Sequence, residues 1–349
     1  MKTKISKLSH SSDDADIIRE AGEIIRQGGL VAFPTETVYG LGGDALNAAS
    51  AERIFAAKGR PADNPLIVHI CRISDIEKIA QDIPDVFYTL ADKFWPGPLT
   101  MILKKSPIVP ESTSGGLSTV AVRMPDNQAA LSLIETAGGF IAAPSANTSG
   151  RPSTTLGKYV IEDMDGRIDM IIDDGQSKIG LESLILDLTT SPPELLRPGS
   201  ITKEMIESVI GTELNISSDE ADEGDKPPRA PGMKYRHYAP KGRMSIIMGG
   251  EETVISYINE KIREDKENNL ITGVIASEKT SIFYQADRVK CIGNRQDEEI
   301  IARNLYRILR EFDEEITDVI YSESFSGGKL GNAVMNRLLK AASHQIINV

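Results

Sequence analysis

The sequence is poor in the residues that build disulfide, zinc and membrane-spanning structures. Its 349 residues include two cysteines, Cys71 and Cys291, which form no CxxC pair and which we interpret as buried or free thiols. The four histidines provide no metal-binding spacing, so we expect no metal site built from protein ligands. No apolar run approaches the about 20 residues of a membrane helix, and the N-terminus lacks an apolar signal-peptide core. We therefore expect a cytoplasmic protein without a membrane segment.

Positive charge is also scarce. Lys and Arg number 39 against 51 Asp and Glu, which gives a formal net charge of −12. Proteins that bind nucleic acid broadly draw their affinity from neutralising phosphates. The acidic balance therefore argues against strong direct binding of nucleic acid, but it allows a local basic pocket for a small anion.

The common nucleotide-site and nucleophile motifs are absent. No GxxxxGK[ST] occurs, so any nucleotide chemistry is not of the P-loop type. No GxSxG occurs, so we expect no covalent serine intermediate. MGGEETV (248–254) is only a faint echo of the dinucleotide fingerprint GxGxxG.

The chain divides by pattern into three parts, consistent with the tendency of chains of this length to form two cores. Residues 10–210 mix strand-like and helix-like segments without strict alternation, which predicts an α/β domain around a twisted mixed sheet. Residues 211–242 are rich in acids and prolines and poor in apolar residues, which indicates a linker. In residues 243–349 strands and helices alternate, which predicts a small Rossmann-like parallel α/β domain. The predicted helices are 13–29, 50–59, 73–81, 84–95, 127–139, 201–210, 251–265, 297–313 and 329–342, and the predicted strands include 30–33, 65–70, 99–103, 119–124, 170–174, 183–188, 244–248, 271–276, 288–293 and 318–323.

Two polar loops follow apolar strands in the first part. PTETVYGLGGDA (34–45) combines hydroxyls with glycines, and APSANTSG (143–150) combines Ser145, Asn147 and further hydroxyls. Each loop is either a turn that satisfies its own backbone or a place where the backbone and short hydroxyls bind a small polar ligand.

Lys58 and Arg60 bracket Gly59 at the end of a predicted helix. They could simply complement the helix dipole. Alternatively, they form a phosphate clamp in which Arg offers a fork and Lys a point charge. The clamp requires the chain to leave helical geometry at Gly59. Pro61 favours this, because a proline disfavours the helical conformation of the residue before it.

Three further residues end or occupy apolar strands. Arg123 ends the strand VAVR, which itself contains no acid, so it pairs either with an external carboxylate or phosphate or with a distant acid. His69 is either a satisfied core group or a ligand-binding residue. Arg197 lies at another strand-like end. Four cations at element ends, beside hydroxyl-rich loops in an acidic chain, favour one shared anion site.

These motifs resemble a known family. PTETVYGLG, KGRPADNPLIVHI, WPGPLT, VAVRMP and APSANTSGRPS are similar to the YrdC-like domain over about residues 10–210, and PGMKYRHYAP with the α/β tail resembles the two-domain Sua5 form of the Sua5/YrdC/YwlC family. The resemblance implies L-threonylcarbamoyladenylate synthase activity: L-threonine, bicarbonate and ATP would give threonylcarbamoyl-AMP, pyrophosphate and water. The product would serve N6-threonylcarbamoyladenosine formation at position 37 of tRNAs reading codons that begin with A. Separate proteins would transfer the group to tRNA.

The resemblance also implies roles for individual residues. Lys58 and Arg60, the KxR motif, would be catalytic, with Lys58 adding charge near the phosphates, and Mg²⁺ would accompany ATP, held by its phosphates more than by protein ligands. Threonine would be held by Thr37, His69, Arg123, Ala143 and Ser183, with Arg123 on its carboxylate and Ala143 acting through its backbone. ATP would be held by Arg60, Asn64, Thr119, Ser145, Asn147, Ser153, Arg197 and Arg236.

Residues 231–240 are too rich in aromatic and polar groups for an idle spacer, and we expect them either to fold over the nucleotide or to anchor the linker on a domain surface. Two alternative functions stay open at this point. One is a related YrdC-like enzyme that makes carbamoyl-adenylate from carbamoyl phosphate, although its usual acylphosphatase and zinc-finger modules are absent. The other is an RNA-binding module without catalysis, which the acidic balance disfavours.

Overall fold

The computed structural model describes residues 2–217, 228–231, 238–325, 327–328 and 330–349. Its chain contacts divide it into two compact units. The first comprises Met1–Ser149, Thr154–Lys178 and Glu182–Tyr235, and the second comprises Gly150–Ser153, Ile179–Leu181 and Arg236–Val349.

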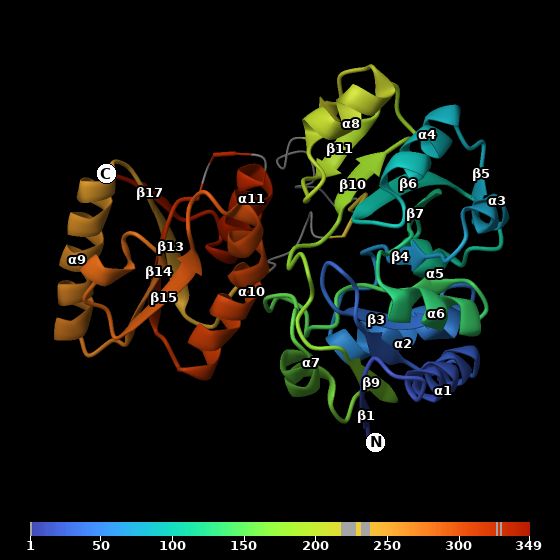
Figure 1. Ribbon diagram of the computed structural model, residues 1–349, viewed down its shortest axis with the longest axis horizontal. Helices are drawn as coiled ribbons and strands as arrows, with labels where there is room; N and C mark the ends of the chain where they lie inside the picture. Colours follow the sequence, from blue (N-terminus) through green and yellow to red (C-terminus); the bar gives the residue numbers. More distant parts are fainter. Residues whose placement is uncertain (1, 218–227, 232–237, 326, 329) are drawn as a thin grey trace. The chain divides into compact units, whose positions relative to one another are not determined.

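The first unit is built on a mixed sheet (Figure 1), as the sequence predicts. The strand order is β1-β9-β2-β3-β8-β4-β7-β6-β10-β11-β12, with β5 pairing to β6. Parallel pairs such as β4–β7 and β6–β10 alternate with antiparallel pairs such as β6–β7 and β4–β8. The strands are β1 (Lys4–Lys7), β2 (Val31–Phe33), β3 (Gly40–Asp44), β4 (Ile67–His69), β5 (Ala80–Gln81), β6 (Leu99–Lys105), β7 (Thr119–Arg123), β8 (Ile141–Ala142), β9 (Met170–Asp173), β10 (Leu184–Asp187), β11 (Glu194–Arg197) and β12 (Asn215–Ile216).

The helices of this unit begin and end where local chemistry dictates. The Asn47 side chain accepts a hydrogen bond from Ala49 N and caps α2, and Gly59 ends that helix in the left-handed region at φ 62°. Asn127 caps α6 and Thr202 caps α8 in the same way. The helices are α1 (Asp14–Arg26), α2 (Ala48–Lys58), α3 (Ile76–Ile79), α4 (Asp85–Phe94), α5 (Glu111–Ser114), α6 (Gln128–Thr136), α7 (Gly157–Met164) and α8 (Lys203–Ile210), with a 3₁₀ turn at Ile73–Asp75.

One predicted loop is in part a strand. Residues 40–44 within the 34–45 loop form β3, which pairs antiparallel with β2 and β8. A Cβ added to Gly40 or Gly42 would lie 2.9 Å from ring atoms of Phe33, so glycine is required for the close approach of the two strands. The predicted helix 73–81 was also wrong in part, because it contains only the 3₁₀ turn and α3 before the chain extends into β5.

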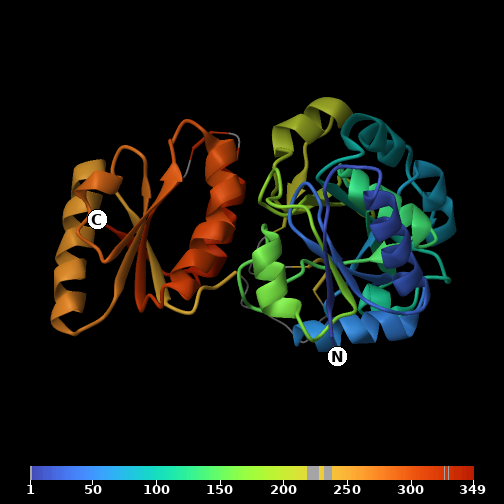
Figure 2. The same ribbon diagram turned by 60° about the horizontal axis from the view of Figure 1, so that its bottom comes forward.

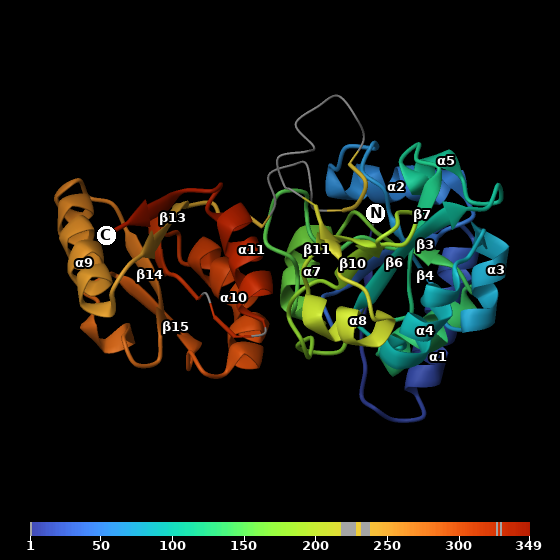
Figure 3. The same ribbon diagram turned by 90° about the horizontal axis from the view of Figure 1, so that it is seen from above.

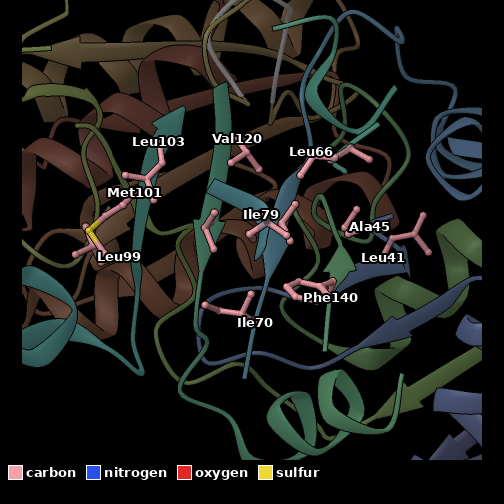
Figure 4. Packing of buried hydrophobic residues seen from close by; sticks show 14 of the residues in the cluster. Leu41, Ala45, Leu66, Ile70, Ile79, Leu99, Met101, Leu103, Val120 and Phe140 are labelled. Carbon is pink, nitrogen blue, oxygen red and sulfur yellow. The ribbon is translucent and has the colours of Figure 1, made fainter. Parts of the chain in front are cut away.

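Side-chain alternation along the strands sorts the core into two faces. Leu99, Met101 and Leu103 of β6 point into a large apolar cluster shared with α2, α3, α4, α7 and α8 (Figure 4). On the opposite face, Val31 and Phe33 of β2 pack with Ile18, Ile25 and Leu133 of α1 and α6. These two helices therefore cover the half of the sheet that contains β9, β2 and β8.

The other half of that second face carries no such helix cluster among the described residues. Ile67, Ala121 and Ile185, which occupy β4, β7 and β10, form a small apolar group with Ile102, Leu196 and Ala230. His69 and Arg123 follow at the ends of β4 and β7, in register with one another. His69 and Arg123 therefore lie on the part of this sheet face that α1 and α6 do not cover.

The second unit is an α/β layer with an all-parallel sheet, as predicted. The strand order is β15-β14-β16-β13-β17. Figures 2 and 3 show α9 on one side of the sheet and α10 and α11 on the other. The strands are β13 (Arg243–Met248), β14 (Thr272–Ser277), β15 (Arg288–Gly293), β16 (Val319–Glu323) and β17 (Ile346–Asn348), and the helices are α9 (Glu251–Glu267), α10 (Glu298–Glu314) and α11 (Gly331–Ala341), with a 3₁₀ turn at Ser281–Phe283.

The described parts of the predicted linker 211–242 are not free chain. β12 pairs with β11, Arg229 forms a two-bond ion pair with Glu194, and Ala230 is fully buried. Among the described residues, no helix is both long enough and apolar enough to cross a membrane.

Candidate functional site

Lys58 joins the two motifs that the sequence singles out. Its side chain is buried, and its ammonium donates to the backbone carbonyls of Ser145 and Asn147. Since Gly59 leaves helical geometry, the chain turns at this point as the clamp hypothesis requires. The KxR motif at 58–60 and the SxN motif at 145–147 therefore lie together.

Arg60 and Asn64 shape the next turn of the chain. Arg60 Nη2 donates to the carbonyls of Asn64 (3.3 Å) and Pro65 (3.0 Å), which fixes the approach to β4. The Asn64 side chain is buried, yet neither its Nδ2 nor its Oδ1 forms a hydrogen bond with the described residues. Buried amides normally have partners, so this amide is available to a ligand.

The loop 145–149 is held from several sides. Ser145 Oγ donates to Asn147 Oδ1, and the Asn147 amide donates to Thr148 O at 2.9 Å. Ser145 also bridges to Gly40 at the start of β3. The two polar loops 34–45 and 143–150, for which the sequence allowed either a turn or a binding role, are thus neighbours.

Arg123 has an internal partner that was not predicted from the sequence. Its Nη2 lies 2.7 Å from Oε2 of Glu36, and both side chains are buried. The sequence left open whether Arg123 pairs with an external anion or with a distant acid. The second alternative is observed, because folding brings loop 34–39 beside the end of β7. No sequence pattern links position 36 with position 123. The sequence does show that Glu36 is an acid in a hydroxyl-rich loop after a buried strand, which could have marked it as a candidate site residue.

His69 lies beside this ion pair and is neutral at physiological pH. Burial, and after it the charge of Arg123, lower the pKa of His69 to about 3. Its Nδ1 is 3.2 Å from the carbonyl of Ile67, and its ring meets Phe33 edge-on. His69 therefore offers a neutral hydrogen-bonding group, not a charge.

Ser183 and Arg197 form a second polar group. Arg197 Nε donates to Ser183 O (3.1 Å), and Nη1 donates to Pro231 O (3.1 Å) in the segment after β11. Ser183 Oγ is 2.7 Å from Thr100 Oγ1, and Thr100 faces Arg123 across the β6–β7 pair. Thr100 was missed by the sequence interpretation, and it connects the group of Arg197 with that of Arg123.

The remaining predicted positions are less informative. Thr37 is buried and bonds to Thr35 at 2.9 Å, the Ala143 N–H is used by Ile67 O, and Thr119 begins β7 half-buried. Ser153 is buried in the Gly150–Ser153 segment, which groups with the second unit. Arg236 lies outside the described residues, as do Tyr235 and His237.

The second unit has a small cavity at the carboxyl ends of its strands. It measures about 130 Å³ and includes Gly249, Glu251, Arg295 and Glu323 in its lining. The faint GxGxxG echo lies at its edge, but α9 begins with Glu251 and Glu252, which disfavour an anion at a helix N-terminus. This arrangement does not support a phosphate site there.

Glu323, in the wall of that cavity, is a fully satisfied carboxylate. It accepts from Thr280 Oγ1, from Tyr284 OH (2.8 Å) and from Ser277 N (3.2 Å), and it pairs with Arg295. Together these donors fill the acceptor positions of a carboxylate.

Family comparisons match the whole architecture. The model described as "Telomere recombination", of the Sua5, YciO and YrdC group, matches residues 23–199. The model described as "Threonylcarbamoyl-AMP synthase, C-terminal domain" matches residues 201–343.

Curated relatives and solved structures agree with these matches. A threonylcarbamoyl-AMP synthase of Pyrococcus abyssi is 50% identical over 95% of this chain and 96% of its own length, and that of Bacillus subtilis is 46% identical over 99% and 100%. Among solved structures, P. abyssi Sua5 complexed with L-threonine has a TM-score of 0.92 and 47% identity, with both chains fully covered. A His-to-Ala, Tyr-to-Ala double variant of P. abyssi Sua5 gives 0.93 and 48% over 99% of this chain and 98% of its own.

Proposed function

Because the chain belongs to the two-domain Sua5 branch of the Sua5/YrdC family of threonylcarbamoyl-AMP synthases, we propose that it forms threonylcarbamoyl-AMP from L-threonine, bicarbonate and ATP. Pyrophosphate and water are the other products, and the enzyme acts as a nucleotidyltransferase. The observation that carries this proposal is the Lys58 ammonium bound to the carbonyls of Ser145 and Asn147, since it unites two motifs separated in sequence into one polar site.

Threonine binds, in this proposal, on the half of the sheet face where His69 and Arg123 end β4 and β7. Its carboxylate meets Arg123, and Thr37, His69, Ala143 and Ser183 surround the rest. His69 suits this role because its lowered pKa keeps it neutral beside Arg123, so it offers a hydrogen bond without a competing charge.

ATP binds beside threonine, near the KxR and SxN motifs. The Asn64 amide, buried and without a hydrogen bond to the described residues, supports this assignment. The proposed contacts are Arg60, Asn64, Thr119, Ser145, Asn147, Ser153, Arg197 and Arg236, with Lys58 near the phosphates.

The chemistry requires placement and charge neutralisation more than an enzymic nucleophile. The threonine amine becomes a carbamate, whose oxygen attacks the α-phosphorus of ATP as pyrophosphate leaves. Mg²⁺ would accompany ATP, held by its phosphates more than by protein ligands.

The wider role follows from the product. We propose that it supplies tRNA N6-threonylcarbamoylation at position 37, that separate proteins transfer the group to tRNA, and that the reaction takes place in the cytoplasm. The net charge of −12 supports a chain that does not itself grip tRNA strongly. We also propose the division into a catalytic domain (10–210), a linker (211–242) and a C-terminal α/β domain (243–349).

Pyrophosphate release is the direct test. The purified chain should release pyrophosphate from ATP only when threonine and bicarbonate are both present. Turnover with carbamoyl phosphate in their place would instead identify a carbamoyl-adenylate enzyme. Salt-sensitive RNA binding without ATP consumption would identify a binding module.

The segment 231–240 is proposed as a cover over the nucleotide. The described end of this segment supports the idea, because Pro231 O accepts a hydrogen bond from Arg197, a proposed ATP contact. Deleting residues 231–240 should greatly slow adenylate formation; unchanged turnover would rule the cover out.

A further inference from the structure

Glu36 is a buried carboxylate with unused acceptors. Its side chain is almost completely inaccessible, and within the described chain neither Oε1 nor Oε2 accepts a hydrogen bond. Among the described residues its one charged contact is Arg123, whose Nη2 lies 2.7 Å away in an ion pair whose geometry is not that of a hydrogen bond. A carboxylate buried in this state is costly unless further donors complete it.

The neighbouring side chains do not provide those donors. Thr35 Oγ1 donates to Val38 O at 2.6 Å and also contacts Thr37 Oγ1, so the hydroxyls of the loop bond to one another. His69 is neutral and engages the carbonyl of Ile67. The acceptors of Glu36 therefore have no hydrogen-bond donor among the residues that the structure describes, and they are available to a ligand.

A positive and a negative group side by side are the complement of an α-amino acid. In a zwitterion one carbon separates the carboxylate from the ammonium, so one molecule can place its carboxylate on Arg123 and its ammonium on Glu36. The proposed threonine site uses Arg123 for the carboxylate and leaves the ammonium without a partner. Glu36 fills that gap with the charge that an ammonium requires.

We propose that Glu36 binds the α-ammonium of threonine and accepts its proton before carbamate formation, an inference that rests on the proposed function. The proton moves from the ammonium nitrogen to a Glu36 oxygen, which gives a neutral amine and a neutral carboxylic acid. The amine lone pair then forms the N–C bond with bicarbonate, and the C–O bond to the bicarbonate hydroxyl breaks as that oxygen takes the second amine proton and leaves as water. Threonine carbamate and water result, and Glu36 later returns its proton to solvent.

This role explains why Glu36 and Arg123 face each other without a hydrogen bond. Each holds the other's charge until the substrate brings the matching groups. General-base catalysis of this kind contributes about 10²- to 10⁴-fold to a rate.

The variant Glu36→Gln tests the inference because it keeps the shape and removes the charge. Asp169→Asn is the matched control: it also breaks a carboxylate–arginine pair of the first unit, Asp169 with Arg53, away from the proposed site. Both variants are compared with the wild-type chain for ATP affinity, threonine affinity, turnover, and affinity for 3-hydroxybutanoate, which is threonine without its amine.

The expected pattern is specific to an amine partner. E36Q should bind ATP normally and 3-hydroxybutanoate at least as tightly as wild type, since Arg123 loses an internal competitor. Its preference for threonine over 3-hydroxybutanoate should fall about tenfold or more. Its turnover at pH 7 should fall about 100-fold and recover steeply at alkaline pH, where the free amine of threonine becomes abundant. D169N should match wild type in all four measurements.

Three outcomes separate the possibilities. If wild type shows no threonine- and bicarbonate-dependent pyrophosphate release, the proposed function fails. If wild type does, but E36Q weakens both ligands equally or keeps the wild-type pH profile, Glu36 is only a structural partner of Arg123 and the inference is overturned. If E36Q does not fold, Glu36→Asp decides: it keeps a carboxylate, so it should show reduced turnover with the wild-type pH profile, and an E36D profile that recovers only at alkaline pH contradicts the inference.

Discussion

The two units each bury a glutamate against an arginine, but they treat it differently. Glu323 in the second unit accepts from Thr280, Tyr284, Ser277 and Arg295. Glu36 in the first unit has Arg123 beside it and no hydrogen bond within the described residues. A satisfied carboxylate holds a structure together, whereas an unsatisfied one retains acceptors that a ligand can use.

The largest difference between the two units is expected when their arginines are substituted. Arg123→Lys removes the guanidinium fork from a buried pair, whereas Arg295→Lys alters a pair whose arginine is 42% exposed. We expect R123K to lower kcat/KM for threonine by about 100-fold, because lysine keeps the charge but cannot reproduce the forked contact of the guanidinium with a carboxylate in this buried site. R295K should leave kcat/KM within about twofold of wild type, since exposed pairs contribute about 0–1 kcal/mol.

Steady-state pyrophosphate release at varied threonine concentration measures both variants. Equal losses in R123K and R295K would mean that the distinction between the two pairs has no functional meaning.

The second unit should respond to loss of its glutamate in stability, not in turnover. Glu323→Gln removes acceptors from Thr280, Tyr284 and the Ser277 amide, and an unsatisfied buried donor costs about 1–3 kcal/mol. We expect hydrogen exchange in residues 272–284 to quicken by about tenfold or more. Fluorescence of Trp95, the single tryptophan of the sequence and a residue of the first unit, should report an unchanged denaturation midpoint. A tenfold loss of kcat in E323Q would contradict the structural role.

The sequence predicts the elements of both units well, because periodicity and caps are local. α1, α9 and α10 lie within three residues of the predicted ranges, and the second unit is parallel as predicted. β3 was missed because its sequence, GLGGD, has a composition typical of turns. Its glycines are set by contact with Phe33, which no local pattern contains.

The candidate site shows the same limit. Lys58, Gly59 and Arg60 could be interpreted locally, because a helix end and a following proline restrict the backbone. The pairing of Arg123 with Glu36 could not, since it depends on which loop reaches the end of β7. Thr100 could not be predicted as a site residue either. Threonine is common in strands, and its role depends on which residue lies beside it in the sheet.

His69 should make the stability of the first unit depend on pH. Its pKa is about 3 in the folded chain, where burial and Arg123 disfavour its charge, and its ordinary value is 6.5. Between these values the unfolded chain binds more protons, so stability falls as pH falls from about 6.5 towards 3. From pH 7 to 5.5 this residue should remove about 1 kcal/mol of stability. His69→Asn, which lacks the titration, should lose that much less over the same range in urea unfolding followed by Trp95. Parallel pH dependences for the two chains would contradict the assignment.

The smallest effect is expected at Thr100, which tests whether the Arg123 and Arg197 groups are coupled. Thr100→Val keeps the shape and removes the 2.7 Å contact with Ser183 Oγ, a neutral hydrogen bond worth about 0.5–1.5 kcal/mol. Ser183 also accepts from Arg197 Nη2 at 3.3 Å, so its freed hydroxyl can turn towards the guanidinium. We expect KM for threonine to rise two- to tenfold with kcat nearly constant, because binding is loosened while the reacting groups are untouched. Thr89→Val, an exposed hydroxyl on α4, is the matched control and should change neither constant. A fall in kcat without a change in KM would instead place Thr100 among the groups that act only in the transition state.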